Sequence, residues 1–376
     1  MLMSHYTGLI DKYRERLPVT NGTAPVSLCE GATPLIELKN LPRFLRRNVR
    51  LYAKFEGLNP TGSFKDRGMT MAVTKAVEGG ARAIICASTG NTSASAAAYA
   101  ARAEITCFVL IPEGKIALGK LSQAMMHGSV VIQIRGNFDD GMRLVQEVSK
   151  TLPLNVVNSI NPYRLQGQKT IAFEVIEALG DAPDYHALPV GNAGNITAHW
   201  IGYSEAACEN TQACAFCNGK CNYQKQKMAK RRPIMLGYQA SGAAPIVRGR
   251  PVENPETIAT AIRIGNPVSW QQAVTASHES GGWFNECSDE EILHVQKLLA
   301  QAEGIFCEPA AATGVAGVLK DLELGRIGDG STIVCTLTGH GLKDPDTAIA
   351  QSAKPLTVDA ELSAIERVIR EHLKGL

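Results

Sequence analysis

The chain has 376 residues, a formal net charge of +2 and 20% charged residues. A chain of this length can bury a large core and is expected to form two lobes or domains. The small net charge and the 6% of aromatic residues give no field or stacking surface that would recruit nucleic acid or membrane. Because no run of about 18 apolar residues occurs and the N-terminus lacks an apolar signal core, we expect a soluble, cytoplasmic protein.

Strand and helix patterns alternate along most of the chain. Short apolar strands are predicted at 49–55, 83–87, 106–111, 130–134, 155–157, 186–190, 234–239 and 333–337. This alternation is typical of mostly parallel sheets with helices on both faces, so the predicted fold class is α/β. Ligands of such sheets bind at the carboxyl ends of the strands.

The first informative turn is G-L-N-P-T-G-S-F-K-D-R-G at 57–68. Its proline and glycines predict a loop, Ser63 is a candidate N-cap, and 64–77 has helical character. Lys65 therefore lies in the first helical turn, where its charge opposes the helix dipole. Such a lysine is a candidate for a lowered pKa and for Schiff-base chemistry, and the alternative is a solvated lysine at a helix start.

Two more strand-to-helix turns carry small polar residues. S-T-G-N-T-S occupies 88–93 and G-N-A-G-N occupies 191–195, each directly after a predicted strand. Glycine-rich turns at helix N-termini present backbone N–H groups that suit a phosphate. One such turn is weak evidence by itself, but two of them together with the lysine turn indicate an anionic cofactor.

A polar segment without hydrophobic periodicity falls between the predicted helix at 196–205 and the strand at 234–239, as an insertion at about 206–232. It contains Cys208, Cys214, Cys217 and Cys221. Thiolates this close can bind one structural centre, either zinc or an iron–sulfur cluster, and their spacing leaves its identity open. Two disulfides or unligated thiols are the alternative.

Five motifs together resemble the threonine synthases. They are S-F-K-D-R-G (63–68), S-T-G-N-T-S (88–93), N-S-I-N-P-Y-R-L-Q-G-Q-K (158–169), G-N-A-G-N (191–195) and T-L-T-G-H-G-L-K-D-P (336–345). That family belongs to the pyridoxal-phosphate enzymes, with tryptophan synthase β and threonine dehydratase. The match runs in register from about Gly31 to about Asp346.

The resemblance implies a two-lobed fold similar to tryptophan synthase β, and a homodimer. The smaller lobe would span 46–164 and carry Lys65 and Asn91, while 1–45 and 165–376 would form the larger lobe. Lys65 would bind pyridoxal phosphate and move protons, and Asn91 would hydrogen-bond the cofactor's 3′-oxygen. Thr338 would meet the pyridine nitrogen. The cofactor phosphate would lie on Gly191, Asn192, Ala193, Gly194 and Asn195.

The resemblance also implies the substrate site. Ser88 and Thr89 would bind the amino-acid carboxylate, and a second, substrate phosphate would lie among Thr92, Asn158, Ser159 and Arg164. Some of the site residues also have a plain structural interpretation: an Asx-turn for Asn91, an ordinary turn for 191–195, a strand-end residue for Thr338 and a surface charge for Arg164.

The implied reaction converts O-phospho-L-homoserine and water into L-threonine and phosphate, by elimination at Cγ and addition of water at Cβ. Two alternatives stay open. One is β-replacement on another phosphorylated amino acid, such as phosphoserine with sulfite in the manner of a cysteate synthase. The other is a metal-responsive regulatory protein in which the lyase site is vestigial.

Overall fold

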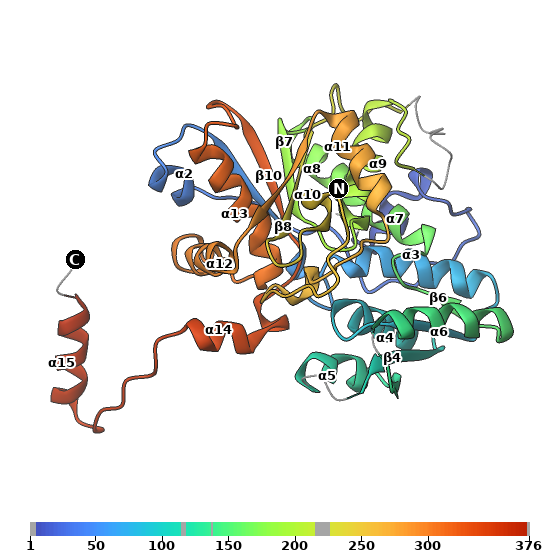
Figure 1. Cartoon of the computed structure of the whole chain (residues 1–376), viewed down its shortest axis with the longest axis horizontal. Helices are drawn as coiled ribbons and strands as arrows, with labels where there is room; N and C mark the ends of the chain where they lie inside the picture. Colours follow the sequence, from blue (N-terminus) through green and yellow to red (C-terminus); the bar gives the residue numbers. More distant parts are fainter. Residues whose placement is uncertain (1–4, 114–117, 137, 215–225, 374–376) are drawn as a thin grey trace. The chain divides into compact units, whose positions relative to one another are not determined.

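The computed structural model of the chain describes residues 5–113, 118–136, 138–214 and 226–373 (Figure 1). It divides into two compact units, Met1–Asp344 and Pro345–Leu376. The second unit contains α14 (Pro345–Gln351) and α15 (Leu362–Leu373). Among the described residues, no helix has the length and apolar character needed to cross a membrane.

The first unit contains a six-stranded sheet in the order β1-β2-β10-β7-β8-β9. Its strands are β1 (Leu35–Glu37), β2 (Arg50–Phe55), β7 (Tyr185–Pro189), β8 (Ile234–Ala240), β9 (Trp283–Cys287) and β10 (Thr332–Leu337). Only the β1–β2 pair is antiparallel. Every residue of β10 is buried, as expected of a central parallel strand covered on both faces.

The second sheet has four parallel strands in the order β5-β4-β3-β6. They are β3 (Ala83–Ala87), β4 (Thr106–Pro112), β5 (Val130–Ile134) and β6 (Asn155–Val156). All five residues of β3 are buried, which explains its continuous apolar sequence. The two sheets confirm the predicted α/β class. The expected lobe boundaries at 46 and 164 stay a prediction, although β2 pairs with β10 in the larger sheet.

Helices cover both faces of each sheet (Figure 1). The larger sheet packs against α12 (Asp289–Glu303) and α13 (Pro309–Glu323) on one face, and against α8 (Thr170–Leu179), α9 (Gly194–Ala207) and α11 (Trp270–Ser280) on the other. The smaller sheet packs against α3 (Lys65–Glu78), α4 (Asn91–Arg102) and α5 (Leu118–Met126) on one face, and α6 (Phe138–Thr151) on the other. The remaining segments are α1 (Leu9–Lys12), η1 (Arg14–Arg16), α2 (Asn40–Phe44), η2 (Glu56–Leu58), α7 (Pro162–Gln168), α10 (Pro245–Arg248), η3 (Thr260–Ile262) and η4 (Gly341–Lys343).

The start of α3 differs from the sequence prediction. Its N-cap is Phe64 rather than Ser63, and Phe64 makes no side-chain cap, although Ser63 Oγ accepts a long hydrogen bond from the Lys65 N–H at 3.4 Å. Ser63 instead forms a β-bridge with Gly339, and the Phe64 N–H donates to the carbonyl of Thr338 at 3.0 Å. The lysine turn is therefore fastened to the end of β10 by backbone contacts.

Helices α3 and α7 touch through two glycines. A Cβ atom added to Gly167 would lie 1.8 Å from the carbonyl oxygen of Arg67. One added to Gly68 would lie 3.1 Å from the carbonyl oxygen of Arg164. Glycine is therefore required at position 167 for this approach of the two backbones, and a β-carbon at position 68 would make the contact tighter than an ordinary one.

Candidate active site

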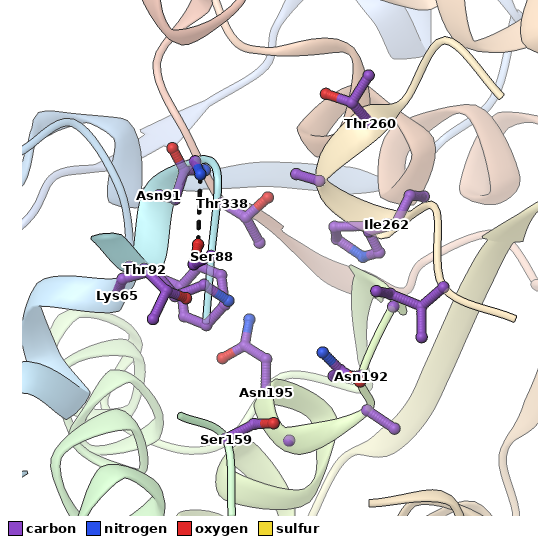
Figure 2. A pocket seen from close by; sticks show the side chains of 18 of the residues that line it. Lys65, Ser88, Asn91, Thr92, Ser159, Asn192, Asn195, Thr260, Ile262 and Thr338 are labelled. Atoms are coloured by element: carbon purple, nitrogen blue, oxygen red, sulfur yellow. Dashed lines mark hydrogen bonds between the residues drawn. The ribbon is translucent and has the colours of Figure 1, made fainter. Parts of the chain in front are cut away.

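A cavity of about 370 Å³ lies where four parallel strands end. Its lining includes the segments that follow β3, β6, β7 and β10, the start of α3, η3 with the residues after it, and Glu308 at the start of α13 (Figure 2). It brings together every cofactor-binding and substrate-binding residue predicted from the sequence: Lys65, Ser88, Thr89, Asn91, Thr92, Asn158, Ser159, Arg164, Gly191, Asn192, Ala193, Gly194, Asn195 and Thr338. The rule that parallel sheets bind ligands at strand ends accounts for this convergence.

Lys65 is the first residue of α3, and its Nζ atom lies 4.1 Å from the centre of the Phe64 ring. Burial lowers the pKa of Lys65 to about 7, helped by the positive charge of Arg164 and opposed by Glu308. An amine with this pKa is substantially neutral near pH 7, so it can act as a nucleophile and as a base.

Sequence reasoning missed Glu308, a buried carboxylate of this cavity. Its two oxygens accept hydrogen bonds from the Asn91 side-chain amide at 3.1 and 3.3 Å. Burial raises the pKa of Glu308, against the Asn91 hydrogen bond and the charges of Lys343 and Lys65. A glutamate just before Pro309 has the appearance of an ordinary helix start, so the sequence offered no signal for this role.

The turn at 191–195 has the features of an anion site. Ala193 adopts the left-handed conformation with φ of 64°, which opens the turn at the N-terminus of α9. The side-chain oxygen and nitrogen of Asn195 are both buried, and neither has a hydrogen-bond partner among the residues that the structure describes. A Cβ atom on Gly191 would lie 3.0 Å from the Cα of Ile262, so a larger residue would crowd this wall of the cavity.

Arg164 is 2% exposed and supplies a second cationic group. One guanidinium nitrogen donates to the carbonyl of Val157 at 3.2 Å, while Nε has no hydrogen-bond partner in the described part of the chain. Within the described parts of the chain, no carboxylate forms an ion pair with it. Burial lowers the pKa of Arg164 to about 10, so the group stays charged at pH 7. A buried, uncompensated guanidinium is costly unless an anion binds to it.

The other predicted substrate residues differ in whether their side chains already form hydrogen bonds within the protein. Asn158 lines the cavity, but its amide also accepts from the Ala87 N–H at 3.1 Å and donates to the Ala87 carbonyl at 2.9 Å. It therefore holds the end of β3, and its role toward a phosphate stays a prediction. Ser88, Thr89, Thr92 and Ser159 all line the cavity.

The cysteine-rich insertion is described only at its edges. Cys208 is the left-handed C-cap of α9, and Cys214 is buried, whereas Cys217 and Cys221 lie outside the described residues. Within the residues that are described, no group of three or more His, Cys, Asp or Glu side chains could hold a metal. The expected metal centre stays a prediction.

Residues 26–339 match the family of pyridoxal-phosphate dependent enzymes. The chain belongs to this family. It is 56% identical to the threonine synthase of Mycobacterium tuberculosis (strain ATCC 25618 / H37Rv) over 94% of both chains. It is 53% identical to that of Halalkalibacterium halodurans over 99% of both, and 50% identical to that of Methanocaldococcus jannaschii over 96% of this chain and 87% of the relative. These likenesses confirm the resemblance to the threonine synthases.

Two solved structures share the fold. Maize serine racemase superposes with a TM-score of 0.69 at 17% identity, covering 98% of this chain and 99% of the racemase. O-ureido-L-serine synthase gives 0.71 at 20% identity, covering 92% and 100%. At this level of identity the likeness supports the architecture alone.

The residues of the cavity fit pyridoxal phosphate. The unpartnered Asn195 side chain and the first N–H groups of α9 suit its phosphate, and the amine of Lys65 suits its aldehyde. Asn91 and Thr338 line the same cavity and offer an amide and a hydroxyl to the ring.

Proposed function

We propose that the chain is a pyridoxal-phosphate-dependent lyase that converts O-phospho-L-homoserine and water into L-threonine and phosphate. One observation carries this proposal: the cavity contains two separate groups for anions. The turn at 191–195 suits the cofactor phosphate, and the buried guanidinium of Arg164 is left for a second one. An amino acid without a phosphate ester has no use for the second group.

The chain's own residues divide the work. The amine of Lys65 holds the cofactor and then moves protons between neighbouring carbons of the substrate, for which a pKa of about 7 is well suited. Ser88 and Thr89 bind the substrate carboxylate. Arg164, with Ser159 and Thr92, binds the substrate phosphate and stabilises it as it leaves Cγ.

Pyridoxal phosphate, when bound, supplies the electron sink that makes the carbon-bound protons acidic. Asn91 would hydrogen-bond its 3′-oxygen, with its amide oriented by Glu308. Thr338 would face the pyridine nitrogen. A hydroxyl keeps that nitrogen largely unprotonated, which favours elimination and replacement over chemistry that needs a stronger sink.

The test is turnover of purified protein with two substrates. We expect L-threonine and phosphate from O-phospho-L-homoserine, and no turnover of phosphoserine with sulfite. Cysteate formation at the higher specificity constant would replace this proposal with the β-replacement alternative. Absence of turnover with both, in protein that holds the cofactor on Lys65, would favour the vestigial-site alternative.

We also propose finer properties that the resemblance to threonine synthases supports. The chain, of 40.3 kDa, is expected to form a homodimer in the cytoplasm, which light scattering and cell fractionation would test. One structural metal centre on Cys208, Cys214, Cys217 and Cys221 is expected per chain.

A further inference from the structure

Four fully buried side chains form a continuous series of hydrogen bonds that ends at the 191–195 turn. His199 Nδ1 lies 2.8 Å from the Asn195 carbonyl oxygen, and His199 Nε2 lies 3.0 Å from Thr336 Oγ1. Thr336 Oγ1 is also 2.8 Å from His186 Nε2, and His186 Nδ1 is 2.7 Å from the Tyr203 hydroxyl. These groups come from three elements: α9, β10 and β7. None of them touches the cavity.

Both histidines are neutral. Burial lowers the pKa of His199 to about 4 and that of His186 well below its ordinary value. A neutral imidazole has one donor nitrogen and one acceptor nitrogen, and a hydroxyl has a single proton. The direction of each hydrogen bond therefore fixes the next.

The direction follows from the Asn195 end. A carbonyl oxygen can only accept, so His199 carries its proton on Nδ1 and its Nε2 must accept the Thr336 proton. Thr336 then has no proton left for His186, so His186 Nε2 donates to Thr336 and His186 Nδ1 accepts from Tyr203. One arrangement of protons satisfies every donor and acceptor of this series, with all four hydrogen bonds directed from Tyr203 toward Asn195.

The hydrogen-bond series ends at the peptide group between Asn195 and Ile196. Its carbonyl receives the His199 hydrogen bond, and its other side is the N–H of Ile196, the third residue of α9. The first N–H groups of a helix lack intrahelical partners, and Ile196 lines the cavity. Hydrogen bonds in series polarise one another, so donation to the carbonyl strengthens the N–H of the same peptide as a donor.

We propose that Thr336, acting through His199, is a positioning residue of the cofactor-phosphate site. It fixes the Asn195–Ile196 peptide against β10 and strengthens the Ile196 N–H toward the phosphate. Thr336 is two residues before Thr338, so the same strand would position the contacts at both ends of the cofactor. The inference rests on the proposed function only through the cofactor, and not through the identity of the substrate.

The test compares two probes on the full chain stripped of its cofactor: pyridoxal 5′-phosphate, and pyridoxal, which has no phosphate. Thr336→Val keeps the shape and removes the hydroxyl, while Thr336→Ser keeps the hydroxyl. For Thr336→Val we expect the dissociation constant of pyridoxal 5′-phosphate to rise about five- to tenfold, the equivalent of one net hydrogen bond, and that of pyridoxal to stay unchanged. Thr336→Ser should bind both probes as the parent does.

Nitrogen NMR of the two histidines supplies a readout that does not depend on binding. The parent should show His199 protonated on Nδ1 and His186 protonated on Nε2. Equal losses for both probes, or no loss for either, would overturn the proposal, as would the opposite tautomers.

If Thr336→Val does not fold, His199→Gln replaces it, because its amide still reaches Thr336 but leaves the Asn195 carbonyl. The same phosphate-selective loss is then expected. Failure to turn over O-phospho-L-homoserine would refute the proposed function and leave this result standing.

Discussion

Lys65 shows how one residue obtains its reactivity from its surroundings. Its amine is placed at a helix start, against an aromatic ring, and in the field of a buried guanidinium. Burial and Arg164 both disfavour the charged ammonium, and Glu308, the carboxylate that opposes them, is partly committed to Asn91.

The rate at which pyridoxal phosphate attaches to the cofactor-stripped chain should report this pKa. The neutral amine is the attacking species, so the rate should rise with pH and reach half its maximum near pH 7 rather than near the usual lysine value of about 10.4. Borohydride should then fix the cofactor on Lys65, and peptide mass spectrometry would locate it. Arg164→Gln should move the midpoint upward; an unchanged midpoint would mean that burial acts alone.

Arg164 should matter far more to turnover than to folding. Arg164→Ala leaves the substrate phosphate without its buried partner, so we expect a loss of about 2 to 5 kcal/mol in kcat/KM for O-phospho-L-homoserine. Arg164→Lys should recover part of it, because a point charge remains but the bidentate fork does not. The affinity for pyridoxal phosphate should hold in both variants. A joint loss of cofactor would mean that the two anion sites have been confused.

At the scale of elements, buried ion pairs join β2, α3 and α8. Arg67 Nε lies 2.6 Å from Glu56, and its Nη2 lies 2.7 Å from Glu174, which also pairs with Lys54 at 2.6 Å. Arg67 and Glu56 are fully buried. This network holds the helix that begins at Lys65.

Breaking the network should be costly. Arg67→Met leaves two buried carboxylates short of a partner, and we expect a loss of about 3 to 5 kcal/mol in the free energy of unfolding, measured with urea. Arg143→Met is the matched control, because its ion pair with Glu147 is exposed and should contribute less than about 1 kcal/mol. Equal losses in the two variants would contradict the role of the network.

The same network predicts the response to acid. Burial alone would raise the pKa of Glu56 and Glu174, yet the charges and hydrogen bonds of Arg67 and Lys54 outweigh it and hold both pKa values low. Their contribution is complete above the unfolded pKa of about 4.3 and disappears as pH falls through the lower folded values. Urea titrations should show the parent losing stability below about pH 4, with a shallower loss in Arg67→Met.

The strands predicted correctly from the sequence are those with a strong apolar pattern. The buried parallel strand β3 is continuously apolar, and β10 is apolar apart from Thr332 and Thr336; the ends of both strands lead into the small polar residues that form the site. The edge strands β1 and β9 were missed, because β1 has three residues and β9 mixes polar and apolar side chains that are mostly half-buried. Glu308 was missed because its partner, Asn91, lies 217 positions away and no local pattern joins them.

At the scale of the whole molecule, the α/β fold gives no reason for the insertion at 206–232. Its start is fastened to α11, where Glu279 accepts hydrogen bonds from Thr211 and Gln212. Elemental analysis of anaerobically purified protein should find one centre of zinc or iron per chain. Replacing Cys214 and Cys217 by serine should remove the metal and lower thermal stability while the cofactor stays bound, since four thiolates leave no position open for substrate.

Cys29→Ser is the control for that experiment, because Cys29 is exposed and distant in sequence from the insertion. It should change neither the metal content nor the stability. Protein without zinc or iron would refute the metal centre. Lost turnover after gentle metal removal, with fold and cofactor retained, would refute its purely structural role.

The contact between Gly68 and Gly167 sets the separation of α3 and α7, two helices that line the cavity. The helix that begins with Lys65 and the helix that carries Arg164 meet backbone to backbone at this contact, so no intervening side chain sets their separation. We expect this separation, which places the amine of Lys65 relative to the guanidinium of Arg164, to favour ligands with a particular number of carbons between the amino group and the phosphate. We expect a β-carbon added at either glycine to push the two helices apart, and so to change which phosphorylated amino acid fits while every group that touches the ligand stays chemically intact.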